Sequence, residues 1–201
     1  MQLLVATTNA NKLREIRGIL ADIDVTLVGL DAFPAVAEPV ETGATFADNA
    51  RAKAIYYSSH LGVVAVAEDS GFVVDALAGD PGIHSARYGG ANATYPERFA
   101  LLYGRLRELQ ALDSPARFVC ALAVARGERV LFEARGTIEG RVADSPRGEH
   151  GFGYDPMFWY PPLSRTLAEL TDGEKAMISH RGQAFRQLHE YLRGSDVFSG
   201  A

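Results

Sequence analysis

A continuous apolar run near the end of the first third of the chain limits the folds that the chain can adopt. Leu61 to Ala67 reads LGVVAVA and contains no polar side chain. Such a valine-rich run is typical of a β-strand that is covered on both faces, as in α/β proteins. We expect this strand to end at Glu68-Asp69-Ser70-Gly71, because two adjacent carboxylates follow the apolar run directly.

The beginning of the chain supports the same fold class. Leu3 to Ala6 forms a short apolar strand, the polar segment Thr7 to Lys12 follows, and apolar residues then recur at helical spacing from Leu13 to Leu20. Val25 to Val28 is a further short strand. This strand–loop–helix–strand order predicts an α/β protein whose first loop lies at a helix N-terminus.

That first loop is a candidate phosphate site. Backbone N–H groups at a helix N-terminus and the helix dipole both favour an anion. Thr7, Asn9 and Lys12 add a hydroxyl, an amide and a cation at the same place. The structural alternative is that Asn9 or Asn11 only caps the helix.

The rest of the chain predicts one domain that spans residues 1–201, without repeats or linkers. Thr45 and Asp48 mark the start of a helix that runs to about Ser59. The other expected elements are a helix over Pro96–Ala111, an antiparallel pair over Arg117–Ala125 and Val130–Ile138, and a last helix from about Ser179. The long hairpin could give the domain a second lobe.

Composition excludes several classes of protein. The 201 residues are 47% hydrophobic and 22% charged, with a net charge of −5, so no basic surface for nucleic acid is expected. The single cysteine, Cys120, allows no internal disulfide and favours a reducing compartment; we interpret it as a buried small hydrophobe without a base partner. No segment has the length and apolarity of a membrane span or a signal peptide, which predicts a cytoplasmic protein.

Carboxylates and a lysine in the first half of the chain are candidates for metal and phosphate chemistry. Asn49 and Lys53 are four residues apart, so they share one helix face. If strand alternation persists, Glu68 and Asp69 point to opposite faces and only one of them meets a ligand. Mg²⁺ takes one or two carboxylates plus phosphate oxygens, and the second could come from Glu38 or Glu41.

Two later clusters each leave two interpretations open. Gly151-Phe152-Gly153-Tyr154-Asp155-Pro156 either stacks aromatic rings on a base or forms a tight turn whose aromatics fill the core. Lys175 and the segment Ser179-His180-Arg181-Gly182 place cations near a helix N-terminus, where the dipole opposes them. They either serve a ligand or pair with a carboxylate. The remaining histidines show no spacing of a metal site.

These segments, in this order, resemble the inosine triphosphate pyrophosphatase family of noncanonical purine NTP pyrophosphatases. The matching text is Thr7-x-Asn9-x-x-Lys12, Glu41-Thr42-Gly43-x-Thr45-Phe46-x-x-Asn49-Ala50-x-x-Lys53-Ala54, Asp69-Ser70-Gly71, Pro81-Gly82-Ile83-x-Ser85-Ala86-Arg87-Tyr88, Gly151 to Pro156, Glu169-Leu170-Thr171-x-x-Glu174-Lys175 and Ile178 to Gly182. The match spans nearly the whole chain. Glu68 stands where many bacterial members carry a second aspartate.

The resemblance implies a fold, an assembly and a site. The fold is α/β, with a long mixed sheet and flanking helices that form two lobes around a central cleft, and the protein is a homodimer that uses Mg²⁺. Asp69 is the general base and a metal ligand, with Glu41 as the second metal ligand. Lys53 assists the loop that grips the triphosphate, and the other binding residues are Thr7, Thr8, Asn9, Ala10, Asn11, Lys12, Ser70, Phe152, Gly153, Tyr154, Asp155, Lys175, His180 and Arg181.

The implied reaction is hydrolysis of inosine, deoxyinosine and xanthosine triphosphates to the monophosphate and pyrophosphate. A metal-activated water attacks the α-phosphorus while Asp69 takes its proton. Donors near His180 and Arg181 select the six-position oxygen of the base, since adenine would leave them without an acceptor. The alternatives are a Maf-type pyrophosphatase for other nucleotides, a phosphatase that removes only the terminal phosphate, and a nucleotide sensor without activity.

Overall fold

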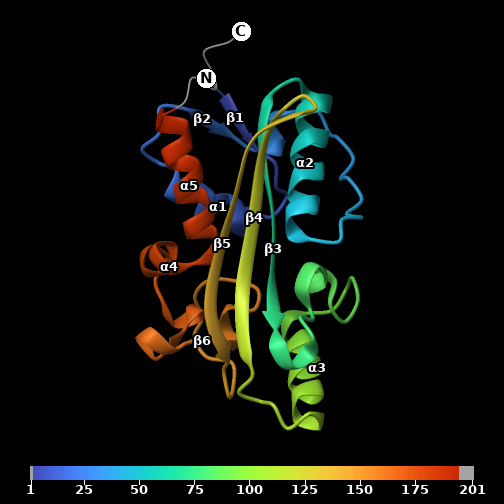
Figure 1. The fold of residues 1–201 in the computed structure, drawn as a ribbon, viewed down its shortest axis with the longest axis vertical. Coiled ribbons are helices and arrows are strands. Elements are labelled where there is room, and N and C mark those ends of the chain that lie inside the picture. Colours follow the sequence, from blue (N-terminus) through green and yellow to red (C-terminus); the bar gives the residue numbers. More distant parts are fainter. Residues whose placement is uncertain (1, 195–201) are drawn as a thin grey trace. The chain divides into compact units, whose positions relative to one another are not determined.

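The computed structural model describes residues 2–194, and these form a mixed sheet (Figure 1). The strand order is β2-β1-β3-β4-β5-β6-β7. The bounds are β1 Gln2–Val5, β2 Thr26–Val28, β3 Val64–Val74, β4 Pro115–Arg126, β5 Arg129–Val142, β6 Phe158–Tyr160 and β7 Arg165–Thr166. β1 pairs in parallel with β2 and β3, whereas β6 pairs antiparallel with β5 and β7. The predicted mixed α/β sheet is therefore confirmed.

Most of the predicted helices are present within one to three residues of their expected bounds. The α-helices are α1 Ala10–Ile19, α2 Phe46–Leu61, α3 Tyr95–Glu108, α4 Asp172–Ile178 and α5 His180–Gly194. α4 was not predicted, because seven residues are too few to show a helical period. Its start is nevertheless marked by a capping box of Thr171 and Glu174. Among residues 2–194, no helix combines the length and the apolarity that a membrane span requires.

The chain divides into two compact units. Unit 1 contains residues 2–69, 120–136 and 180–194 of the described chain, and unit 2 contains residues 70–119 and 137–179. The elements of each unit pack around cores of their own. The expectations of a single domain and of a cleft between two lobes stay predictions.

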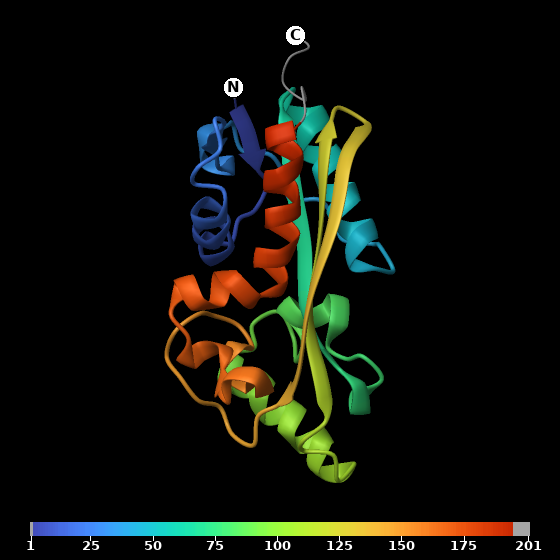
Figure 2. The ribbon, with the colours of Figure 1, turned by 60° about the vertical axis from the view of Figure 1, so that its left-hand side comes forward.

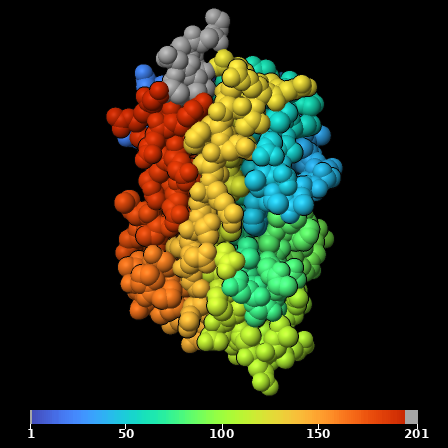
Figure 3. Space-filling model, in the orientation of Figure 1, coloured from blue at the N-terminus to red at the C-terminus, as the bar shows by residue number. Residues whose placement is uncertain are grey.

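In unit 1, helices cover both faces of the sheet. On one face, Ile16 of α1 and Leu188 of α5 pack on Val66 of β3, and Figure 2 shows α5 beside α1. On the other face, α2 packs on the sheet in a core rich in alanine, which includes Ala54 and Ala65 beside Tyr57. Figure 3 shows the surfaces of α5, the first part of β5 and α2.

In unit 2, an aromatic and aliphatic core fixes α3 and the last strands. Phe72 of β3, Leu102 and Leu106 of α3 and Phe158 of β6 are completely buried in this core. α3 begins at Thr94, whose side chain and Glu97 form a capping box, and Pro96 lies in its first turn as predicted.

Some strand boundaries were predicted wrongly: β3 begins at Val64 rather than Leu61, and β5 continues past Ile138 to Val142. β3 does not end at Ala67 but continues through Glu68 and Asp69 to Val74. Two adjacent carboxylates are tolerated inside a buried strand because each has cations on its own face, as described below. The predicted alternation persists, so the two side chains point to opposite faces of the sheet.

Candidate active site

The carboxylate of Asp69 faces α2 and is held by two side chains of that helix. Lys53 Nζ lies 3.1 Å from Asp69 Oδ1, and Asn49 Nδ2 donates a hydrogen bond of 3.1 Å to Asp69 Oδ2. Asn49 and Lys53 therefore share one helix face, as their spacing predicted. Asp69 is 6% exposed, so its carboxylate is nearly removed from water.

A second carboxylate reaches the same lysine. Lys53 Nζ donates to Glu41 Oε1 at 2.8 Å, so a single ammonium group contacts both Glu41 and Asp69. Burial opposes the charge on Lys53, but Asp69 and Glu41 outweigh it and raise the pKa of the ammonium. Lys53 therefore stays charged between two carboxylates. Paired carboxylates of this kind are the ligands that a hard cation prefers.

Asp69 has the electrostatics of a general base. Burial raises the pKa of Asp69 above its ordinary value, the Lys53 ammonium offsets part of this rise, and the Glu41 carboxylate adds to it. A carboxylate with a raised pKa accepts a proton more readily than an exposed one. The geometry therefore supports the role that the resemblance implies for Asp69.

On the opposite face of β3, Glu68 is surrounded by cations. Lys12 Nζ lies 2.9 Å from Glu68 Oε1, and Arg181 Nη2 lies 3.0 Å from the same oxygen. Arg181 Nη1 also binds Glu15 Oε2 at 2.7 Å. Burial opposes ionisation of Glu68, but Arg181 and Lys12 outweigh it and hold the pKa of this carboxyl well below its usual range. Glu68 therefore orients two of the predicted ligand-binding residues.

Two interpretations change with this network. For Arg181, the structure shows the carboxylate-paired alternative, with the carboxylates of Glu15 and Glu68 as partners. Cys120 is buried as expected, but its Sγ also donates to Glu68 Oε2 at 3.3 Å, so the expectation that no base partner lies nearby is wrong. Burial raises the pKa of the Cys120 thiol well above its usual value, which makes a nucleophilic thiolate unfavourable.

The loop before α1 is ordered by its own side chains. The Oδ1 atom of Asn9 accepts hydrogen bonds from the N–H groups of Asn11 and Lys12, and Thr7 Oγ1 accepts from Asn9 N–H. The capping role of Asn9 is thus present in the structure. Thr8 and Ala10 are exposed at the same turn. Phosphate binding by this loop stays a prediction, with the Lys12 ammonium beside it.

In unit 2, the Phe152–Asp155 turn is fixed by a buried ion pair. Asp155 Oδ2 accepts a hydrogen bond from Phe152 N–H at 2.7 Å and from Lys175 Nζ at 2.6 Å. Lys175 Nζ also lies 4.7 Å from the centroid of the Phe152 ring. Gly153 has a φ of +69°, a conformation that few other residues adopt without strain. These contacts gather Phe152, Asp155 and Lys175 in one place.

The two aromatic rings of this turn have different environments. Tyr154 is 3% exposed, its ring stacks on Phe72 with centroids 5.3 Å apart, and its hydroxyl donates to the carbonyl of Ser85. The interpretation as a core aromatic is therefore correct for Tyr154, and its ring has no open face for a base. Phe152 is only half-buried, and it remains the aromatic candidate for base stacking.

The remaining predicted residues lie next to these groups in the chain. Ser70 follows Asp69 directly on β3 and is half-buried. His180 is the first residue of α5 and is buried, next to Arg181. Asn49 and Glu68 were considered beside Lys53 and Asp69 but were assigned no role, and Glu15 was not predicted. The spacing of Asn49 from Lys53 was a usable signal for Asn49, whereas no sequence pattern connects Glu15 to Arg181.

The donor set fits a metal of one particular kind. In the part of the chain that the structure describes, no three histidine, cysteine or acidic side chains converge as a metal cage. Glu41 and Asp69 are two hard oxygen donors near a common point, the Lys53 ammonium. So small a set of protein ligands is compatible with Mg²⁺, whose shell phosphate oxygens and water can complete.

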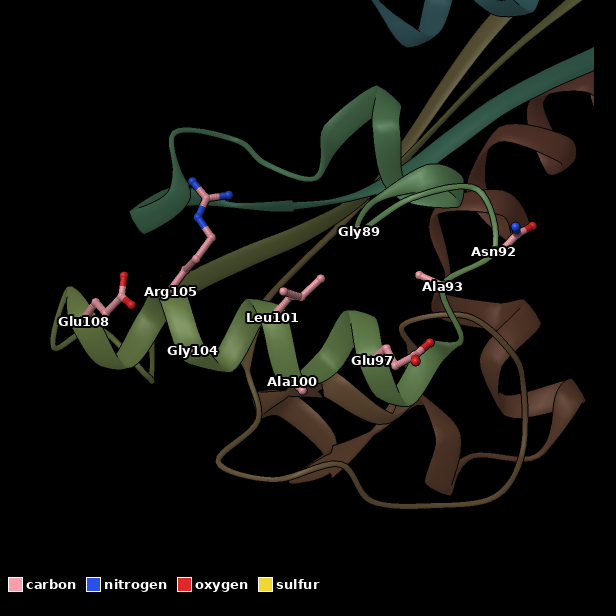
Figure 4. Close-up of a pocket in the computed structure, with 9 residues that line it drawn as sticks. All are labelled: Gly89, Asn92, Ala93, Glu97, Ala100, Leu101, Gly104, Arg105 and Glu108. Atoms are coloured by element: carbon pink, nitrogen blue, oxygen red, sulfur yellow. The ribbon is translucent and has the colours of Figure 1, made fainter.

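A hollow in the surface of unit 2 is separate from the predicted residues. It measures about 700 Å³ and lies along α3 and the loop before it (Figure 4). Leu101, Glu97 and Arg105 are among its lining side chains, and none of the residues predicted for the active site is. We therefore assign no nucleotide to it.

A mixed sheet that carries a buried carboxylate, held by lysine and asparagine, on an interior strand is the framework of an α/β enzyme. Comparison with protein families identifies the family within this class. The model of the Ham1 family matches residues 3–191, and the chain belongs to this family. The family resemblance inferred from the motifs is thereby confirmed.

Curated relatives carry one shared name. A dITP/XTP pyrophosphatase of an Exiguobacterium species is 44% identical over 188 residues, which cover 94% of this chain and 95% of the relative. The dITP/XTP pyrophosphatase of Thermus thermophilus is 45% identical over 190 residues, which cover 94% of this chain and 91% of the relative.

Solved structures agree with the fold. A HAM1 protein from Coxiella burnetii has a TM-score of 0.90 and 39% sequence identity, covering 97% of this chain and all of that structure's chain. A protein described as a nucleoside-triphosphatase / dITP/XTP pyrophosphatase from Mycobacterium abscessus has a TM-score of 0.75 and 40% identity, covering 96% and 99% of the two chains.

Proposed function

We propose that this chain hydrolyses noncanonical purine nucleoside triphosphates, namely those of inosine, deoxyinosine and xanthosine, to the monophosphate and pyrophosphate. The observation that carries the proposal is the buried Asp69 carboxylate, which contacts Lys53 and Asn49 and shares Lys53 with Glu41. The names of the curated relatives support the substrate class.

In the proposed reaction, the oxygen of a water molecule attacks the α-phosphorus. The bond between the α-phosphorus and the oxygen that bridges to the β-phosphorus breaks, and pyrophosphate leaves with the bonding electrons. Asp69 accepts the proton of the attacking water. Lys12 and Lys53 balance negative charge on the phosphates, and the buried setting of Lys53 strengthens its effect because few water molecules screen it.

We propose Mg²⁺ as the cofactor, with Asp69 and Glu41 as its protein ligands. When bound, Mg²⁺ neutralises phosphate charge and makes a water molecule more acidic. The two carboxylates share the Lys53 ammonium through one oxygen each, so their remaining lone pairs would be the ones that face a bound cation.

We assign recognition of the nucleotide's purine base to residues of the later motifs. Phe152 offers a half-buried ring, and the ammonium of Lys175 is held beside it by Asp155. Because Arg181 binds Glu68 and Glu15, we assign the contact to the six-position oxygen first to its neighbour His180. A donor that adenine would leave without an acceptor gives selectivity of about 1–3 kcal/mol.

A panel of nucleoside triphosphates tests the proposed function. With Mg²⁺ present, we expect pyrophosphate and monophosphate from inosine, deoxyinosine and xanthosine triphosphates, much slower release from adenosine triphosphate, and loss of turnover after chelation of the metal. Preference for uridine triphosphate would favour a Maf-type enzyme, and inorganic phosphate as the first product would indicate a terminal phosphatase. Tight binding without turnover would indicate a sensor.

We further propose that the chain acts as a homodimer in the cytoplasm. Leu101 and Leu109 on and after α3 are about half exposed, and such side chains are common at contacts between subunits. Light scattering after size exclusion should give twice the mass of one chain. A mass of one chain at micromolar concentration would refute the dimer, and recovery from a membrane fraction would refute the location.

A further inference from the structure

Asn49 connects two parts of the site that are distant in the sequence. Its Nδ2 donates to Asp69 Oδ2 on β3 at 3.1 Å, and its Oδ1 accepts the N–H of Gly43 at 2.8 Å. Asn49 itself is 1% exposed, and its bond to Asp69 is buried, whereas its bond to Gly43 is partly buried. One side chain therefore links the carboxylate of Asp69 to the segment that contains Glu41.

The approach of Gly43 to Asn49 is close enough to exclude other residues. A Cβ atom at position 43 would lie 2.6 Å from Asn49 Oδ1 and 2.9 Å from the backbone nitrogen of Asn49. Real Cβ atoms do not approach other atoms this closely, so a side chain at this position would push the segment away from α2. Glycine at position 43 thus allows the Asn49 bond to form.

The same segment is anchored at its other end. The hydroxyl of Tyr56, one helical turn beyond Lys53 on α2, donates to the carbonyl of Ala37 at 2.9 Å. Residues 37–43 are thereby attached to α2 at both ends, and Glu41 between them meets Lys53. The stronger anchor is the bond between Gly43 and Asn49, because it is partly buried whereas the bond of Tyr56 is exposed to competing water.

We propose that Asn49 is a positioning residue for hydrolysis, which holds the Asp69 carboxylate and the Glu41 segment in a fixed relation. This inference rests on the proposed function and deepens it. An amide suits the role because it donates to a carboxylate and accepts from a backbone N–H at the same time. Partners that orient a catalytic carboxylate typically affect rate by about 10- to 100-fold.

Replacement of Asn49 by alanine and by aspartate separates its two bonds. Asn49→Ala removes both, and we expect kcat to fall by about 10- to 100-fold while KM changes little. In the metal-free protein, the Gly43 amide should exchange its hydrogen about tenfold faster, as expected for one lost hydrogen bond. Asn49→Asp keeps the acceptor for Gly43 but not the donor to Asp69, so kcat should fall while Gly43 stays protected.

Ser58→Ala is the matched control. Ser58 lies on the same helix, is equally buried, and likewise links two segments, since its Oγ donates to Val63 O and accepts from Gly127 N–H. We expect this variant to lose stability but not kcat. An unchanged kcat in both Asn49 variants, or an equal loss in Ser58→Ala, would overturn the positioning role. A wild-type chain that releases no pyrophosphate would instead refute the proposed function itself.

Discussion

Asp69→Asn is expected to lower the rate of pyrophosphate release by about 100- to 10,000-fold, the range usual for loss of a general base. The asparagine side chain has the same shape and still offers an oxygen to Lys53, which in addition keeps Glu41 as a partner, while its Nδ2 loses the bond from Asn49 at a cost of about 1–3 kcal/mol of stability. The fold and the affinity for nucleotide should therefore survive. Initial rates with inosine triphosphate, together with a thermal unfolding curve, measure both effects.

The pH dependence of the wild-type rate checks the same assignment. Only the ionised carboxylate accepts a proton, so the rate should rise with pH through the pKa of Asp69, which burial places above its ordinary value. Asp75→Asn is a suitable control, because this carboxylate directly follows β3 and pairs with Arg117 at the surface. A near-normal rate in Asp69→Asn, or an equal loss in Asp75→Asn, would refute Asp69 as the base.

Local patterns predicted those parts of the site that depend on neighbours in the sequence. The spacing of Asn49 and Lys53, the helix start at Thr45 and the opposite orientation of Glu68 and Asp69 all follow from helix and strand periods. Each of these features is determined by a few residues that are close together in the sequence. The structure confirms these three predictions for that reason.

Features decided by distant residues could not be predicted in the same way. β3 continues past Ala67 because Lys12, Lys53 and Arg181 supply cations to its carboxylates, and these residues lie far away in the sequence. The burial of Tyr154 similarly depends on Phe72 and Ser85. The sequence Gly-Phe-Gly-Tyr-Asp alone is compatible with an exposed aromatic ring or with a ring that is buried in the core.

The family resemblance predicted a relation between distant segments that helix and strand periods could not predict. It related the separate segments to one family before any contact was known, and the Ham1 match over residues 3–191 confirms that relation. It did not identify Asn49 or Glu68 as links between the segments, because such a role becomes visible only when partners and distances are known. Geometry therefore adds positioning residues to a set of ligand-binding residues.

Arg181→Met is expected to lower the free energy of unfolding by about 3–5 kcal/mol, the usual cost of breaking a buried ion pair. Methionine fills a similar volume but carries no charge. Glu68, whose side chain is 2% exposed, would then keep only Lys12 as a cation in the network, and Glu15 would lose the guanidinium. Urea unfolding followed by far-ultraviolet circular dichroism measures the change. Such a loss would show that the guanidinium of Arg181 stabilises the fold through its pairs with Glu68 and Glu15.

The same substitution at Arg117 separates a buried network from a surface one. Arg117 also contacts two carboxylates, Asp75 and Glu139, but its side chain is 31% exposed. Arg117→Met should therefore cost only about 0–1 kcal/mol, because water screens exposed pairs and solvates the partners that remain. If Arg181→Met unfolds at the same urea concentration as Arg117→Met, the pairing of Arg181 with Glu68 does not stabilise the fold. Its guanidinium would then be available to bind the base directly, as the family resemblance implies.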